Sequence, residues 1–330
     1  MNNFLFQRFR SATVLVIGDV MIDCYLKGKV TRISPEAPVP VMNVLSRDYR
    51  LGGAANVALN VQALGAKPIL CAVVGGDEKG SLFSDLLAQH QLSNEGIMVL
   101  DSRKTTVKYR VVGNNSQMMR IDEEDDSLLQ LADAQSFYRK VADLIENHSI
   151  DAIIFEDYDK GLLSKDLIQN IVQLAISKNI LITVDPKRRN FKYYQNVTMF
   201  KPNLKELTEG LYGEAGHLSM EEVERSMRDF ANEQNISVLL TTMSEHGVAV
   251  YERANDTFST QPAYRREIAD VSGAGDTVIS VATLCLVAGV DCQKAAHIAN
   301  LAGGIVCESA GVVPISAEQL ELEIARLDVQ

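Results

Sequence analysis

The chain has 330 residues, of which 46% are hydrophobic and 23% are charged, as in an ordinary globular protein with a full core. Its formal net charge of −11 argues against nucleic-acid binding, which needs a broad basic surface. The five cysteines form no CxxC pair and no zinc-type cluster, so we interpret them as thiols in a reducing compartment. The sequence has no apolar stretch long enough for a membrane span and no signal-peptide pattern, which predicts a cytoplasmic protein without a membrane partner.

Apolar runs of strand length alternate along the chain with helical patterns. In chain order, the predicted buried strands are TVLVIGD, PILCAVVGG, DAIIFED, ILITVDP and VLLTT. Helices are predicted at GGAANVALNVQALG, with Gly65 as its stop, and at Ser164–Lys178 and Met220–Gln234. This alternation predicts an α/β fold with a doubly wound, mostly parallel sheet flanked by helices. Ligands of such sheets bind outside the carboxyl ends of the strands, so the residues that follow strands are candidates for a site.

Residues 24–45 and 105–122 break the alternation. Both segments carry alternating apolar residues, and the first also contains Pro35, Pro38 and Pro40. We expect short strands outside the main sheet and interpret them as a small β-lid over the active site, with a plain surface hairpin as the alternative. The sequence shows no repeat or linker, so residues 1–330 are expected to form one domain with this lid. Unpaired strand edges seek partners, which predicts a homodimer through the lid.

The segment DVSGAGDTVISVATLCLVAG, residues 270–289, carries the strongest chemical signal. Gly273, Ala274 and Gly275 precede an apolar helix, whose unpaired amides and dipole form an anion site. Asp276 lies inside this site, where a carboxylate can accept the proton of a hydroxyl that attacks a phosphate. A simple helix cap is the alternative for Asp276. Two other phosphate motifs are excluded, because GGDEKGS lacks the P-loop lysine and no GxGxxG follows a strand.

Four motifs together resemble the ribokinase-type carbohydrate kinases. DVSGAGD is similar to the C-terminal signature of that family, and GGAANVA is similar to its N-terminal signature. KPNLKE resembles the N-x-x-E motif of the family, and VGGDEKG resembles its G-x-D-x-x-G turn. The motifs occur in family order across nearly the whole chain. This resemblance implies a ribokinase-like fold and a kinase that uses ATP and Mg²⁺.

Further segments resemble the branch of the family that phosphorylates heptose 7-phosphates: TRISPEAPVPV, RIDEED, EDYDKG and VDPKRRN. This resemblance implies transfer of the ATP γ-phosphate to the anomeric hydroxyl of D-glycero-β-D-manno-heptose 7-phosphate. The heptose 1,7-bisphosphate would lead to ADP-heptose for lipopolysaccharide. Many such kinases are fused to an adenylyltransferase with an H-x-G-H motif. The sequence lacks that motif, so we expect the kinase half alone and a separate adenylyltransferase in the pathway.

Two positions depart from the family pattern. Val271 stands where ribokinases usually carry Thr, although heptose kinases often carry Val there. The segment ESAGVVP lacks the Gly-Thr pair expected near the C-terminus, so a monovalent cation is an option whose requirement the sequence leaves open.

The resemblance implies roles for individual residues at the nucleotide. Gly273, Ala274 and Gly275 would supply the anion hole, and Asp276 would be the base. Asn203 and Glu206 would organise Mg²⁺ and the ATP phosphates, Glu206 through water, although a capping box explains the same pair equally well. The other expected nucleotide contacts are Leu204, Lys205, Thr242, Ser244, Gly247 and Asn300, the last of them near the adenine.

The sugar is expected to contact residues that follow strands or begin the first helix: Asp23, Gly52, Gly53, Asn56, Asp157 and Asp185. Local turn and cap bonding is the alternative for Asp23 and Asn56. A 7-phosphate needs local cations in an acidic protein, and Lys187 is the first candidate, ahead of Arg120 and Lys160. A solvated surface run is the alternative for Lys187–Arg189.

Other functions remain alternatives to a heptose kinase. The nearest is another ribokinase-type kinase that acts on ribose or a fructose phosphate, which a substrate panel would distinguish. A non-catalytic sugar-phosphate sensor on the same fold would consume no ATP. A dehydrogenase would have to bind NAD, for which the fingerprint is missing.

Overall fold

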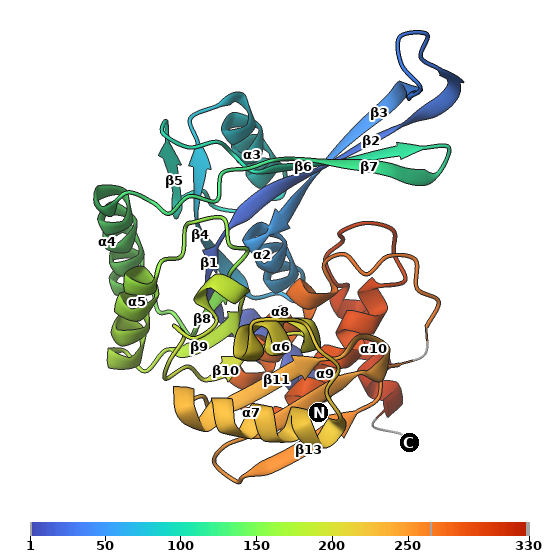
Figure 1. The fold of residues 1–330 in the computed structure, drawn as a ribbon. Coiled ribbons are helices and arrows are strands. Elements are labelled where there is room, and N and C mark those ends of the chain that lie inside the picture. The colour runs from blue at the N-terminus through green and yellow to red at the C-terminus, as the bar shows by residue number, and fades with distance from the viewer. Residues whose placement is uncertain (1, 265, 328–330) are drawn as a thin grey trace.

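The computed structural model describes residues 2–264 and 266–327. These residues form a nine-stranded sheet with helices on both faces and a separate four-stranded sheet that projects from the body (Figure 1). No helix in the described ranges is long and apolar enough to cross a membrane.

The nine-stranded sheet has the order β13-β12-β11-β10-β9-β8-β1-β4-β5 and is parallel except for the β12 and β13 edge. The predicted doubly wound, mostly parallel sheet and its five buried strands are therefore confirmed. The strands are β1 (Thr13–Gly18), β4 (Lys67–Gly75), β5 (Ile97–Leu100), β8 (Ala152–Glu156), β9 (Leu181–Asp185), β10 (Met199–Phe200), β11 (Val238–Thr242), β12 (Val248–Glu252) and β13 (Thr257–Gln261).

Helices cover both faces of this sheet because side chains of its central strands alternate between two cores. In β1, Val14 and Val16 face one core, while Leu15 and Ile17 face the other. The first core is packed by α1 (Asn2–Ser11), α2 (Ala54–Ala63), α3 (Glu78–Gln89), α8 (Ala274–Val287), α9 (Cys292–Val306) and α10 (Ala317–Leu327). The second is packed by α4 (Leu131–Asn147), α5 (Lys165–Ser177), α6 (Leu204–Tyr212) and α7 (Met220–Gln234).

The register of the parallel strands brings polar residues to one edge of the sheet. Gly18 of β1 pairs with Glu156 of β8, and Glu156 pairs in turn with Asp185 of β9. Lys201 follows β10 directly, and its amide bonds to Val184. The carboxyl ends of four strands therefore meet at one place, as expected for a ligand site in such a sheet.

The four-stranded sheet, with order β3-β2-β6-β7, contains the segments 24–45 and 105–122. Its strands are β2 (Val20–Ile33), β3 (Pro40–Gly53), β6 (Val107–Gly113) and β7 (Ser116–Glu123). The expectation of short strands was wrong for β2 and β3, which have 14 residues each. Both are long because they begin or end inside the body, where their residues are buried, and extend into solvent at the other end.

The G-x-D-x-x-G turn has a structural role. The Asp77 carboxylate caps α3 by accepting the Gly80 amide at 2.8 Å, and it also accepts the amide and hydroxyl of Thr105 at 2.9 and 2.8 Å. Thr105 lies just before β6. Asp77 therefore attaches the start of β6, and with it the hairpin of β6 and β7, to the body of the protein.

Candidate active site

Asp276 lies in the first turn of α8, at the carboxyl edge of the sheet. Gly273 precedes the helix with a φ of 84°, a conformation that favours glycine, and no side chain caps the helix there. Within the described residues, the amides of Gly275 and Asp276 donate no hydrogen bond. This helix start therefore has donors available for an anion.

Two neutral donors hold the Asp276 side chain, which is only 5% exposed. The Asn56 amide donates to Oδ2 at 2.7 Å, and the Tyr158 hydroxyl donates to Oδ1 at 3.0 Å. Burial raises the pKa of Asp276, and the Asp185 charge raises it further, whereas the two hydrogen bonds and Lys201 lower it. The residue is a buried, oriented carboxylate of increased basicity, as a general base requires.

A buried ion pair lies beside the anion hole. The Lys201 ammonium is 2.7 Å from the Asp185 carboxylate, and both side chains are less than 10% exposed. A Cβ placed on Gly275 would be 3.6 Å from Lys201 Nζ, so Gly275 leaves this ammonium open toward the helix start. Burial and the charges of Asp185 and Asp276 raise the pKa of nearby Glu156 well above its usual value. Asp185, expected to contact the sugar, is instead the partner of Lys201.

Sequence reasoning missed Lys201 and Tyr158. Lys201 stands immediately before the Pro-Asn of the N-x-x-E motif and directly after a strand, which was an available signal. Tyr158 follows the β8 strand inside EDYDKG, but an isolated tyrosine in a loop carries no chemical signature.

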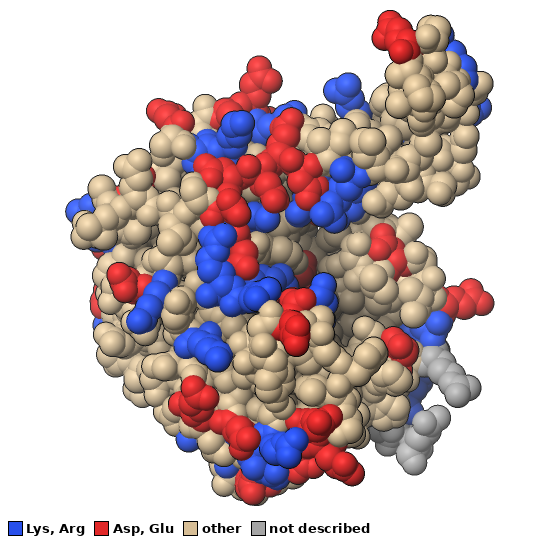
Figure 2. All heavy atoms as spheres, viewed as in Figure 1, with Lys and Arg blue, Asp and Glu red and all other residues tan. Residues whose placement is uncertain are grey.

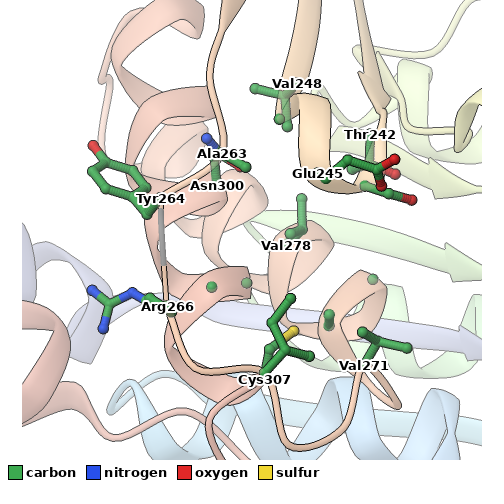
Figure 3. Close-up of a pocket in the computed structure, with 17 residues that line it drawn as sticks. Thr242, Glu245, Val248, Ala263, Tyr264, Arg266, Val271, Val278, Asn300 and Cys307 are labelled. Carbon is green, nitrogen blue, oxygen red and sulfur yellow. The ribbon is translucent and has the colours of Figure 1, made fainter.

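A cavity of about 550 Å³ opens beside the anion hole (Figure 3). It brings together six residues that were expected near the nucleotide: Thr242, Ser244, Gly247, Ala274, Gly275 and Asn300. Its apolar walls include Val248, Ile268, Val271 and Val278, which suit an adenine ring. Of these four residues, the sequence analysis singled out only Val271, where ribokinases usually carry Thr. Tyr264 and Arg266 extend on the side opposite Thr242 and Glu245 (Figure 3).

Asn203 and Glu206 form the capping box that begins α6. The Asn203 amide donates to Glu206 Oε2 at 2.9 Å, and the Glu206 amide donates to Asn203 Oδ1 at 2.8 Å. Lys187 forms an ion pair with the other carboxylate oxygen of Glu206. Among the described residues, no group of three or more His, Cys, Asp or Glu side chains forms a metal cage.

Leu204 and Lys205, the middle residues of the N-x-x-E motif, do not line the cavity. Leu204 packs against the second core, because it occupies the inward side of the first turn of α6. Lys205 is 73% exposed and lies 3.7 Å from Glu209 on the same helix. Helical periodicity points the Leu204 side chain into the core and the Lys205 side chain into solvent, so their expected contact with the nucleotide stays a prediction.

The residues expected at the sugar divide into two groups. Asp23 and Gly52 lie together on neighbouring strands, since a Cβ on Gly52 would be 2.4 Å from Asp23 Oδ2. The adjacent Gly53 has a φ of 61° and begins α2. Arg110 of β6, which sequence reasoning missed, forms an ion pair with Asp23. Burial raises the pKa of Asp23, while Arg110 opposes this increase.

Asn56 and Asp157 belong to the other group. The Asn56 side chain is fully buried and its amide binds Asp276, so it supports the base and does not face the sugar. Asp157 accepts hydrogen bonds from Asn190 at 2.9 Å, Tyr194 at 2.8 Å and the Asp159 amide at 2.9 Å. These bonds hold the Asp157 carboxylate inside the protein, and its expected contact with the sugar stays a prediction.

The three cations proposed for the 7-phosphate lie in different places. Lys187 pairs with Glu206, and its ammonium lies 5.2 Å from the ring centre of Tyr158, which itself binds Asp276. Lys187 therefore lies beside Glu206 and Tyr158, and its expected contact with the 7-phosphate stays a prediction. Lys160 pairs with Glu124 at 2.9 Å. Arg120 of β7 is 53% exposed and bonds to Asp122.

The surface agrees with this distribution of charge. Figure 2 shows Lys and Arg side chains gathered beside the hollow that lies below the projecting sheet, with acidic side chains among them. A local basic region inside an acidic protein is what polyanionic ligands require.

Comparisons with known proteins agree with this geometry. The model of the pfkB family carbohydrate kinases matches residues 11–319. The bifunctional protein HldE of Desulfatibacillum aliphaticivorans is 37% identical over 96% of this chain, and that of Helicobacter pylori J99 is 36% identical over 94%. The HldE of Pseudomonas aeruginosa is 37% identical over 97%. This chain spans 64%, 65% and 65% of the length of these three relatives.

Solved structures share the fold. Escherichia coli phosphofructokinase-2 in complex with potassium has a TM-score of 0.79 at 16% identity and covers 96% of this chain and 99% of its own. A ribokinase from Thermotoga maritima has a TM-score of 0.70 at 18% identity and covers 95% of this chain and 99% of its own. The ribokinase-like fold is thus confirmed. With a family model that matches most of its length and relatives above 30% identity, the chain belongs to the pfkB family of carbohydrate kinases, which transfer phosphate to an alcohol group.

Proposed function

We propose that this protein is an ATP-dependent kinase that phosphorylates the anomeric hydroxyl of D-glycero-β-D-manno-heptose 7-phosphate. The product is the heptose 1,7-bisphosphate, a precursor of ADP-heptose for lipopolysaccharide. The observation that carries a kinase reaction is the position of Asp276, a buried carboxylate between a cavity of nucleotide size and an anion site at the start of α8. The heptose substrate is supported by the 36–37% identity to HldE proteins over nearly the whole chain.

In this proposal, the residues of the chain divide the work of phosphoryl transfer. Asp276 accepts the proton of the attacking hydroxyl, and the amides of Gly275 and Asp276 bind the charge that develops on the transferred phosphate. Lys201 and Lys187 add positive charge on either side, since Lys201 lies beside Gly275 and Lys187 beside Tyr158. Positioning and electrostatic stabilisation dominate such reactions, so preformed groups suffice.

Magnesium would neutralise the ATP phosphates. Glu206 fits this role, because its carboxylate is fixed by the capping box and is only 12% exposed. The described side chains provide no carboxylate cage, which suits a metal that keeps its waters and binds mainly through phosphates.

We propose that the four-stranded sheet acts as a lid on the sugar. It carries Asp23 and three cations, Arg110, Lys108 and Arg120. The charges of these three cations lower the pKa of Asp23. The Arg120 side chain is 53% exposed, compared with 15% for Arg110 and 14% for Lys108. Arg120 is therefore our first choice for binding the 7-phosphate.

The outer part of the same sheet would hold a second copy of the chain. It exposes a group of apolar side chains that water should disfavour: Ile33, Val39, Val44, Leu45, Met118, Met119 and Ile121. A homodimer through the lid would cover them. Sedimentation of the wild type and of Leu45→Glu tests this, because a monomeric wild type would contradict it.

A substrate panel tests the function directly. ATP consumption is measured with heptose 7-phosphate, ribose and fructose 6-phosphate, and ³¹P NMR identifies the phosphorylated position. We expect turnover with heptose 7-phosphate to exceed the others. Equal or faster turnover of ribose or fructose 6-phosphate would favour another sugar kinase, and no turnover with any of them would favour a sensor. Each reaction is run with KCl and with tetramethylammonium chloride, which tests a monovalent cation such as that in the phosphofructokinase-2 structure.

The proposed enzyme works in the cytoplasm, where ATP and sugar phosphates are made. An adenylyltransferase activity would then use the product after loss of one phosphate. Neither nucleic acid nor a membrane takes part in this reaction.

A further inference from the structure

The loop that follows β8 is held rigidly beside the base. The Asp19 carboxylate accepts the amides of Tyr158 at 2.9 Å, Lys160 at 3.0 Å and Leu162 at 3.3 Å. The chain turns through left-handed conformations at Asp159, with a φ of 55°, and at Gly161, with a φ of 82°. Three amide bonds to one buried carboxylate fix the backbone of the loop, and therefore the place of the Tyr158 side chain.

Tyr158 joins the two sides of the site. Its hydroxyl donates to Asp276 Oδ1 at 3.0 Å, and the Lys187 ammonium lies over its ring at 5.2 Å. Lys187 in turn pairs with Glu206, the residue we assign to Mg·ATP. The phenol ring thus lies between the base and the nucleotide side.

We infer that Tyr158 is a positioning residue that fixes the orientation of the Asp276 carboxylate and keeps it ionised for proton transfer. This inference rests on the proposed kinase reaction. A hydroxyl donates a stronger hydrogen bond to an ionised carboxylate than to a protonated one, so the bond favours the form that acts as a base. With Asn56 on Oδ2 and Tyr158 on Oδ1, both oxygens are held, and the free lone pairs of the carboxylate have a fixed direction.

The other charged groups around Asp276 come from three strands. Asp185 at the end of β9 and Glu156 at the end of β8 oppose ionisation of the base, while Lys201 after β10 favours it. Burial and these acidic groups also raise the pKa of Tyr158 well above its usual value, so its hydroxyl keeps its proton in the working range of the enzyme. Tyr158 can therefore donate at any pH at which Asp276 is ionised.

The test is Tyr158→Phe, which removes the hydroxyl and keeps the ring below Lys187. Loss of a hydrogen bond to a charged group is expected to lower kcat by about 10- to 100-fold. The acidic limb of the kcat–pH profile is expected to move to higher pH by about one unit, because the base becomes harder to ionise. Wild type and variant use the same substrates, so titration of the phosphates cancels in the comparison.

Tyr194→Phe is the matched control. Tyr194 also donates its hydroxyl to a buried aspartate, Asp157, at 2.8 Å, but it lies outside the site. Its loss is expected to reduce stability and to leave the limb of the pH profile in place. A Tyr158→Phe enzyme whose limb does not move would overturn the inference, even if kcat fell, because a purely structural defect would explain that result.

A second measurement does not depend on turnover. The pKa of Asp276 is read by ¹³C NMR of labelled carboxyl groups, with Asp276→Asn to assign its signal. We expect a higher pKa in Tyr158→Phe and an unchanged one in Tyr194→Phe. An unchanged pKa in Tyr158→Phe refutes the role of Tyr158 whatever the kinase assay shows. A raised pKa in a protein that consumes no ATP would keep this role and refute the proposed reaction.

Discussion

Substituting Asp276 by Asn separates its chemical role from its structural one. The new amide keeps the size of the side chain, its oxygen can accept from Asn56, and its NH₂ can donate to the Tyr158 hydroxyl, so both contacts survive. The variant has lost only the ability to take a proton. A positioned base accelerates turnover by about 10²- to 10⁴-fold. Turnover of the variant is expected to fall by that factor, which corresponds to an activation free energy higher by about 3–5 kcal/mol.

The stability of the folded protein should not fall with the activity of Asp276→Asn, and it can increase. The pKa of Asp276 is raised in the folded protein, so its ionised form costs stability, and this cost appears as the pH rises above the unfolded value of 3.8 through the folded pKa. Asn carries no charge at any pH. Asp276→Asn is therefore expected to unfold at the same or a higher temperature than wild type at pH 7.5, and this advantage should disappear at acidic pH.

The assay pairs ADP release in the presence of heptose 7-phosphate with calorimetric binding of Mg·ATP. We expect Asp276→Asn to bind Mg·ATP nearly as well as wild type and to release little ADP. Activity within about threefold of wild type would refute the role of Asp276 as the base, because no positioned base contributes so little.

Three further predictions follow from the surrounding contacts. Glu206→Gln should raise the KM for Mg·ATP and leave the KM for the sugar unchanged; the opposite pattern would remove Glu206 from the metal site. Arg120→Ala should cost about 1.5–3 kcal/mol of affinity for heptose 7-phosphate and little for unphosphorylated heptose, whereas Lys187→Ala should impair both equally, and reversed results would restore the original choice of Lys187. Burial raises the pKa of Asp157 to about 7, so the wild-type Tm should fall as the pH rises through that value; Asp157→Asn should lower Tm but flatten this dependence, and an unflattened melting profile would contradict the assignment.

The fold could be predicted from the sequence because its signals are local. A buried parallel strand appears as a continuous apolar run, and the helical pattern of the sequence predicts α7 at Met220–Gln234, where the structure has it. Residues near the expected nucleotide site could also be predicted, because a glycine-rich helix start or a strand end is a local sequence feature that lies next to the site it forms. The cavity accordingly collects six of the residues expected there.

The contacts that select a partner for each polar side chain could not be predicted in this way. Asn56 and Tyr158 meet Asp276 across 220 and 118 residues of chain, and Arg110 meets Asp23 across 87. Whether a side chain faces a ligand or another residue depends on such contacts, and a single sequence does not contain them. The hydrogen bond from Asn56 to Asp276 is a contact of this kind, which the sequence did not predict.

The buried charges of the site also resolve a difficulty posed by the composition. In the proposed reaction, a protein with a net charge of −11 binds ATP, yet an unpaired lysine in a buried or half-buried position would be costly to hold before the nucleotide arrives. Here each lysine forms an ion pair with a carboxylate, Lys201 with Asp185 and Lys187 with Glu206. Phosphate oxygens are acceptors of the same kind, so arriving ATP can share these ammonium groups without first drawing them out of water. A Mg²⁺ ion bound with ATP would offset the charge of the carboxylates, so these ion pairs organise the site for the phosphate before it binds.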